Sequence, residues 1–146
     1  MTEKGIFFAG PDHHAVEGLL SAAGLPVEDI HLCSMDHFIG YRTPSGTLSG
    51  VAGLQLFGTV GLVRSLAVAS TLRQQGIGQQ LLKQIEQHAV AQGVRQLYLL
   101  TTTAKPFFLR HGYQEADRAQ APLPIGQTPE FSGLCPATAS FMHKSL

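Results

Sequence analysis

The sequence predicts a mixed α/β domain, and two observations lead to this fold class. The first is a run of extended segments separated by short turns, which is typical of an antiparallel meander. The second is a long amphipathic helix between two apolar segments, which is the usual crossover between parallel strands. With 146 residues, of which 44% are hydrophobic and 14% charged, the chain can bury the core of one domain spanning residues 1–146.

Composition also excludes several classes of protein. The formal net charge is zero, which argues against a nucleic-acid-binding protein with its basic surface and gives no attraction to anionic membranes. The apolar stretch at residues 5–9 is too short for a secretory or membrane-spanning segment. Cys33 and Cys135 do not have metal-ligand spacing, so no metal site is predicted. We therefore expect a cytoplasmic protein with reduced thiols.

The N-terminal part is expected to form a strand and a helix. Residues 6–9 are apolar, and Pro11-Asp12 then offers a helix start with Asp12 as the N-cap. Gly24-Leu25-Pro26 ends that helix. Residues 27–34 have no regular pattern, and a plain connector is the simplest interpretation.

The meander follows. Residues 37–42 alternate in polarity and are followed by the turn Thr43-Pro44-Ser45-Gly46. Residues 48–57 form the second strand, Gly58-Thr59 makes a tight turn, and residues 60–69 form the third strand.

A long helix is predicted between residues 73 and 92. Gly93 stands at the position after the helix where glycine is favoured. The apolar residues that recur at helical spacing, and so define one buried face, are Ile77, Leu81, Leu82, Ile85 and Ala89. The next strand, residues 96–100, should pair in parallel with residues 60–69.

The C-terminal part is expected to alternate between short elements and a long connection. Thr103 can cap a short helix that has Pro106 in its first turn and ends at Gly112. Strands are expected at residues 113–116 and 137–143. Between them, residues 117–133 are rich in proline and glycine, which favours a binding loop or a dimer contact.

The start of the long helix has the chemistry of an anion site. Gly76 and Gly78 let an anion approach the unpartnered N–H groups of the first turn, and Arg73 adds a full positive charge. A P-loop is excluded, because no Lys-Ser or Lys-Thr follows the second glycine. A dinucleotide fingerprint would need a third glycine. A plain helix start with two tolerated glycines is the alternative.

Two motifs resemble those of a known family. Arg73-x-x-Gly76-x-Gly78, preceded by Ser65-Leu66-Ala67-Val68, resembles the acyl-CoA signature of the GNAT superfamily of N-acetyltransferases. Ala104-x-x-Phe107-Phe108-x-x-x-Gly112-Tyr113 resembles its second signature, usually Ala-x-x-Phe-Tyr followed by Gly-Phe. The resemblance is best over residues 51–113. Residues 98–103 and 134–139 are similar to a narrower group, the N-acetyltransferases associated with bacterial arsenic-resistance operons.

This resemblance implies a fold, a co-substrate and a set of contacts. The fold would be a GNAT-like mixed sheet whose central parallel pair splays apart, with helices on both faces. Acetyl-CoA would be the co-substrate, with the backbone of residues 66–68 bonding its pantetheine amides. The residues implied to contact acetyl-CoA are Leu66, Ala67, Val68, Arg73, Gln74, Gln75, Gly76, Ile77, Gly78, Gln79, Thr101, Phe107 and Phe108.

The catalytic groups are less clearly marked. A backbone N–H near Leu66 can polarise the thioester carbonyl, and a base must take the proton of the amine. No Glu lies in the predicted strands that face the site, and Gln55 stands where a carboxylate would serve, so His37 is the titratable candidate, with an ordinary strand residue as the alternative. Thr101 replaces the Asn, and Phe108 the thiolate-protonating Tyr, of many GNAT enzymes.

The acceptor is expected to be the primary amine of a small, anionic, amino-acid-like molecule. Arg42 and Arg64 lie on the meander, where a guanidinium can bind an anionic group, with Gln55 beside them; a solvated side chain is the alternative for each arginine. In the family, the region after the first helix often lines the acceptor pocket, which draws attention to His31, Cys33 and Asp36. The arsenic-resistance resemblance implies an arsenic-bearing or phosphinic amino acid.

Other functions and assemblies remain open at this point. An acyl-CoA sensor without turnover and a protein N-terminal acetyltransferase are the alternatives to a small-molecule N-acetyltransferase. A homodimer is expected, because residues 117–133 and the last strand would leave apolar surface and a strand edge to cover.

Overall fold

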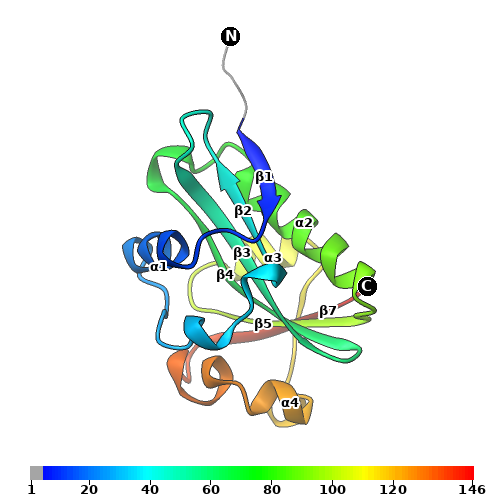
Figure 1. Cartoon of the computed structure of the whole chain (residues 1–146). Helices are drawn as coiled ribbons and strands as arrows, with labels where there is room; N and C mark the ends of the chain where they lie inside the picture. The colour runs from blue at the N-terminus through cyan, green and yellow to red at the C-terminus, as the bar shows by residue number, and fades with distance from the viewer. Residues whose placement is uncertain (1–4) are drawn as a thin grey trace.

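A seven-stranded mixed sheet organises the chain in the computed structural model, which describes residues 5–146. Its strands are β1 (Ile6–Ala9), β2 (Phe38–Arg42), β3 (Leu48–Phe57), β4 (Val60–Val68), β5 (Gln96–Thr101), β6 (Gln114–Glu115) and β7 (Ser140–Ser145). They are ordered β1-β2-β3-β4-β5-β7-β6, and the β4–β5 pair is parallel while the other neighbours are antiparallel. The predicted mixed fold is confirmed (Figure 1).

Four helices and several shorter turns connect the strands. The helices are α1 (His13–Ala22), α2 (Ile77–Ala91), α3 (Lys105–Arg110) and α4 (Leu123–Gly126). The 3₁₀ turns are Ile30–Leu32, Met35–His37, Ser70–Leu72 and Arg118–Gln120, and a π-helical turn spans Glu130–Leu134. No helix within residues 5–146 is both long and apolar enough to cross a membrane.

The helices cover the sheet on two sides, with α1 on one and α2 on the other (Figure 1). The apolar stripe of α2 packs with α3 on side chains of the inner strands, including Ala52, Leu54 and Val63. On the opposite face, α1 buries Val16 and Leu20 against the sheet. The segment that contains α4 covers another part of the sheet, with Ile125 fully buried. A site on the face that carries α1 would lie between α1 and the segment that contains α4.

The local signals placed most boundaries correctly. Asp12 caps α1 by accepting a hydrogen bond from the Ala15 N–H (3.0 Å), as predicted. Gly93 follows α2 with a φ of 87°, a left-handed conformation that favours glycine. Pro106 lies in the first turn of α3, and the parallel partner of β4 is β5.

Four expectations about elements need correction. His37 ends a 3₁₀ turn and does not belong to β2. Thr103 does not cap α3; the Thr101 hydroxyl accepts the Ala104 N–H (3.0 Å) instead. The last strand starts only at Ser140, and its outer edge is partly covered, because β6 pairs with Met142 and His143. The long connection contains short helical elements, because prolines at helix starts are compatible with them.

Candidate functional site

The central parallel strands pair only over a short length and then separate. Residues 60–62 of β4 pair with residues 96–98 of β5. Beyond that point β5 continues to pair with β7 on its other edge as far as Thr101, while the β4 edge that faces β5 has no strand partner. The predicted splay is therefore present, and it leaves free backbone groups in the middle of the sheet.

A bulge in β4 accompanies this separation. Val51 pairs with Ala67 and Gly53 with Arg64, so two residues of β4 stand opposite Ala52 alone. Ser65, one of the two, has a φ of 59°, which is unusual for a residue with a side chain. A bulge increases the local twist of its strand and is frequent beside functional sites. Here it turns β4 away from β5 where the two strands part.

A cavity of about 340 Å³ occupies the gap between the two strands. Its central part consists of residues 63–66 and 99–104. Phe108 lines it from the α2 face of the sheet, whereas residues 24–26, Glu130 and residues 134–136 line it from the opposite face. The cavity thus connects the two faces through the open strand pair.

A second hollow, of about 540 Å³, lies at the start of α2. Gly76 precedes the helix with a φ of 79°, and a Cβ there would have no atom within 4 Å. The predicted residues Val68, Arg73, Gln74, Gly76, Ile77, Gly78, Gln79 and Phe107 line this hollow, together with Leu72, Arg110 and His111. Two arginines and the first-turn N–H groups give it a positive character that suits phosphate groups.

Of the other predicted cofactor residues, three line the first cavity and two line neither hollow. Leu66, Thr101 and Phe108 line the cavity between the strands. Ala67 is buried in the core beneath α1, and Gln75 lines neither hollow. Phe108 packs edge-on against Tyr113, with ring centroids 5.5 Å apart, so its side chain is held by the core.

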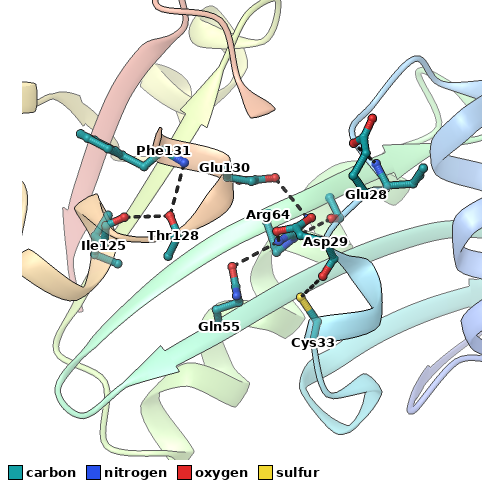
Figure 2. A network of polar contacts seen from close by, with 11 residues as sticks. Glu28, Asp29, Cys33, Gln55, Arg64, Ile125, Thr128, Glu130 and Phe131 are labelled. Carbon is teal, nitrogen blue, oxygen red and sulfur yellow. Dashed lines mark hydrogen bonds and ion pairs between the residues drawn. The ribbon is translucent and has the colours of Figure 1, made fainter. Parts of the chain in front are cut away.

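Arg64 is the centre of a buried polar network (Figure 2). Its Nη1 and Nη2 donate to the two Asp29 carboxylate oxygens at 2.5 and 2.6 Å, and the residues of this pair are each 3% exposed. Nη1 also donates to Gln55 Oε1 (3.2 Å), and Nε donates to the Ser65 hydroxyl (3.0 Å). Four hydrogen bonds therefore engage a guanidinium that the sequence analysis assigned to the acceptor.

Glu130 approaches this network from the C-terminal segment. Its Oε1 lies 3.6 Å from Arg64 Nη2, beyond hydrogen-bond length, and the residue is 5% exposed. Within residues 5–146, no donor forms a hydrogen bond to its carboxylate. Burial raises the pKa of Glu130 from 4.5 to about 7; nearby Arg64 opposes this rise and the Asp29 carboxylate adds to it.

A turn rich in local hydrogen bonds holds Glu130 in place. The Thr128 hydroxyl donates to the Ile125 carbonyl (2.7 Å) and accepts the Phe131 N–H (3.3 Å), as Figure 2 shows. Phe131 packs edge-on against Phe141 of β7, with centroids 5.2 Å apart. The backbone carrying Glu130 is thereby tied to the sheet, and the side chain points toward Arg64 (Figure 2).

Two predicted site residues lie outside the cavity. His37 does not line it; its Nδ1 lies 2.9 Å from Nε2 of His88 on α2, where partial burial and the neighbouring His37 lower the pKa of His88. Arg42 is exposed at the end of β2 and stacks over the Phe8 ring at 5.1 Å. Neither residue lines the cavity, because strand position alone does not indicate which end or face of a strand meets it.

The region after α1 contributes differently than expected. None of the three lines the cavity. His31 and Asp36 are exposed, and the Cys33 thiol donates a hydrogen bond to the Asp29 carbonyl at 3.7 Å. Asp29 instead ties this region to the sheet, because its carboxylate accepts a hydrogen bond from Arg64 of β4. The sequence analysis missed Asp29 and Glu130. The expected binding loop at residues 117–133 was the one signal that pointed to the second.

The fold agrees with the comparison to known families. Residues 34–115 match the model of the acetyltransferase (GNAT) domain, and the chain belongs to this family. Solved structures with the same fold include an N-acetylglutamate synthase from Neisseria gonorrhoeae in complex with coenzyme A and L-arginine (TM-score 0.80, 20% identity, 99% of this chain and 34% of the other). This chain thus spans about a third of that synthase.

Two further structures match over nearly their whole length. Rv2747 from Mycobacterium tuberculosis, solved in complex with CoA and a second ligand, has a TM-score of 0.81 at 19% identity, covering 97% of this chain and 99% of the other. A GNAT-family acetyltransferase from Staphylococcus aureus has a TM-score of 0.75 at 17% identity, with coverage of 97% and 99%. At these identities the matches establish the fold.

Proposed function

We propose that the protein is an N-acetyltransferase that moves an acetyl group from acetyl-CoA to the primary amine of a small molecule. The observation that carries this proposal is the pair of hollows: one lies at the positively charged start of α2, and the other lies between the open strands and is lined by the buried Glu130 carboxylate. The GNAT family and the CoA complexes of similar folds support it.

The two hollows provide a place for each part of acetyl-CoA. Its phosphates would lie at the start of α2, against Gly76, Gly78 and Arg73, where side chains leave the backbone accessible. The pantetheine amides would bond to the free edge of residues 66–68, as another strand would. The thioester would then reach the bulge, where the Leu66 N–H can polarise its carbonyl.

The acceptor would enter from the face that carries α1 and the C-terminal segment. At the wall of the cavity, the Glu130 carboxylate and the Arg64 guanidinium lie 3.6 Å apart. This pair of opposite charges complements the ammonium and the anionic group of an amino-acid-like molecule. An arsenic-bearing or phosphinic amino acid, which the resemblance to the arsenic-resistance group implies, is the finer proposal, with Gln55 and Arg64 near its anionic group.

The test is an acetyl-transfer assay with a panel of primary amines. The panel would contain neutral amines, proteinogenic amino acids, phosphinic and arsenic-bearing amino acids, and short peptides with free N-termini. We expect CoA release and an acetylated product with amino-acid-like members. Acetylation of peptides alone would identify a protein N-terminal acetyltransferase, and acetyl-CoA binding without any product would identify a sensor.

We also propose a homodimer and a single domain. Leu123 of α4 is 73% exposed in the proline-rich segment that was expected to form the contact. The last strand would contribute less than expected, because β6 pairs with Met142 and His143 on its outer edge. Light scattering should therefore give a dimer whose mass is halved by Leu123→Asp; a monomeric wild type at micromolar concentration would contradict this.

A further inference from the structure

The Glu130 carboxylate is a buried group with no hydrogen-bond partner in the described part of the chain. It lines the cavity beside the open strand pair, and its side chain is 6% exposed. Its contact with Arg64 is 3.6 Å long, and Arg64 already donates two hydrogen bonds to Asp29. Burial of a carboxylate is costly unless it is paired and hydrogen-bonded, and Glu130 has only this one long ion pair, so a site that keeps it has a use for it.

The other titratable side chains that line this cavity cannot accept a proton near neutral pH. These are Arg64, whose pKa is raised by its hydrogen bond to Asp29 despite burial, and Cys135, whose pKa burial raises to about 11. Tyr113, near Phe108, donates its hydroxyl to Glu86 (2.8 Å) and does not line the cavity. Glu130 is thus the carboxylate in reach of an amine bound there.

We propose that Glu130 binds the ammonium group of the acceptor and acts as the general base that removes a proton from it. The proposal rests on the acetyl-transfer function proposed above and adds the catalytic residue. It replaces His37 in this role, because His37 lies away from the cavity beside His88.

The proton balance is simple. The ammonium transfers one proton to the Glu130 carboxylate, and the neutral amine then attacks the thioester carbon, forming a C–N bond while the carbonyl electrons move to oxygen. When the intermediate collapses, the C–S bond breaks and CoA leaves as a thiolate. The nitrogen loses its second proton to solvent, the thiolate gains one from solvent, and Glu130 releases the proton it took to solvent and is ionised again. The products are the amide, CoA with a free thiol, and one released proton.

The charges around Glu130 come from several elements. Arg64 of β4 faces it directly, Asp29 and Cys33 come from the loop after α1, and Cys135 follows the turn that carries Glu130. Because burial outweighs Arg64, the pKa of Glu130 is about 7. A base with a pKa close to the operating pH combines a large ionised fraction with useful proton affinity.

The experiment measures kcat and kcat/KM between pH 5.5 and 9.5 for wild type and two Glu130 variants, with an amine from the panel. Glu130→Gln keeps the shape of the side chain and removes the base. Glu130→Asp keeps a carboxylate but withdraws it from the cavity. Glu28→Gln is the matched control, because Glu28 is an exposed carboxylate that only accepts the Val27 N–H at the edge of this region. Thermal shift by acetyl-CoA verifies that each variant is folded.

The expected outcome is a loss of about 10²- to 10⁴-fold in kcat for Glu130→Gln at pH 7, the range typical of a lost general base. The acid limb of the wild-type profile, near pH 7, should disappear, and the residual rate should rise with pH as the free amine forms. Glu130→Asp should lose at least about tenfold in kcat and should keep an acid limb in its pH profile. Glu28→Gln should match wild type.

Other outcomes overturn specific statements. A wild type that acetylates the amine, with unchanged rate and pH profile in Glu130→Gln, overturns the role of Glu130 but not the acetyl transfer. If Glu130→Gln does not fold, a wild-type rate and pH profile in Glu130→Asp would also overturn the proposed role of Glu130. A wild type that binds acetyl-CoA but acetylates no member of the panel overturns the proposed function and, with it, this inference.

Discussion

Arg64 connects three segments that are distant in the sequence. From β4 it bonds Asp29, after α1, and faces Glu130, near the C-terminus. Four of its hydrogen bonds are internal, so the residue has a structural task besides any contact with a substrate. The sequence could not indicate this, because an arginine on a strand is usually solvated.

The first prediction follows from this network. Arg64→Met should destabilise the protein by about 3–5 kcal/mol, because it leaves the buried Asp29 carboxylate unpaired. The double variant Arg64→Met, Asp29→Leu should regain part of that loss, since no charge is then stranded. Urea unfolding measures both. If Arg64→Met were as stable as wild type and only raised KM for an anionic acceptor, Arg64 would be a substrate-binding residue alone.

Glu130 leads to a prediction about stability and pH. Its pKa is higher in the folded protein, about 7, than its ordinary value of 4.5, so folding favours the protonated form. The stabilisation is complete below about pH 4.5 and is lost as the pH rises through 7, and the difference amounts to at most about 3 kcal/mol at 1.36 kcal/mol per pKa unit.

Glu130→Gln should therefore be more stable than wild type at pH 8 and nearly equal to it at pH 5. Thermal unfolding at both pH values provides the measurement, and Glu28→Gln should change stability at neither. Such a gain in stability on removal of a functional group is a common cost of active sites. Equal stability of Glu130→Gln and wild type at pH 8 would mean that the carboxylate is well solvated.

Phe108 carries the prediction for the leaving group. It lines the cavity where many GNAT enzymes have a Tyr, and it cannot donate a proton, so another group or solvent would protonate the thiolate in the proposed reaction. Phe108→Leu should keep kcat within about tenfold, compared with about 10²- to 10⁴-fold for a lost general acid, and weaken mainly acetyl-CoA affinity. Phe108→Tyr should raise kcat modestly if protonation limits the rate.

The kinetic measurement is kcat at several pH values for both variants. A loss of several hundred-fold in Phe108→Leu, with unchanged acetyl-CoA affinity, would show that this position and the second signature are misaligned.

At the scale of the element, the start of α2 determines how the phosphates would bind. Gly76→Asp should abolish the thermal shift caused by acetyl-CoA, because it places a negative charge beside the phosphates. Gly76→Asn is the matched control: both residues tolerate the left-handed φ of 79°, and only Asp is charged. Asn should retain most of the shift. Equal loss in both variants would attribute the effect to bulk or strain, and an unchanged shift with Asp would contradict the phosphate site.

Elements with local signals were predictable from the sequence. The meander and α2 were predicted because turn residues and apolar periodicity act over a few residues. Thr103 was expected to cap α3, but the helix has no side-chain cap; the path of the chain after β5 instead brings the Thr101 hydroxyl to the N–H of Ala104, the residue before the helix.

The acceptor side of the site was predictable only in outline. Asp29, Arg64 and Glu130 meet through the packing of three separate segments, and no spacing in the sequence encodes that encounter. Resemblance indicated the helix start and the free edge of β4, because those depend on contiguous motifs. The proposed base, Glu130, has no signal of its own in the sequence because it comes from a turn in the proline-rich segment and not from a strand.

At the scale of the whole molecule, the short β4–β5 pairing has a consequence for cooperativity. One half of the sheet, β1 to β4, is joined to the other, β5 to β7, by three paired residues in each central strand, so the two halves share few main-chain hydrogen bonds. A ligand lying between them would act as a common neighbour of both. We expect hydrogen exchange at residues 63–68 and 99–101 to slow together when acetyl-CoA is added, and to stay fast in Gly76→Asp. Protection of only one strand would show that the two halves of the sheet respond independently. Protection of both would mean that bound acetyl-CoA bridges β4 and β5 where the strands do not pair with each other.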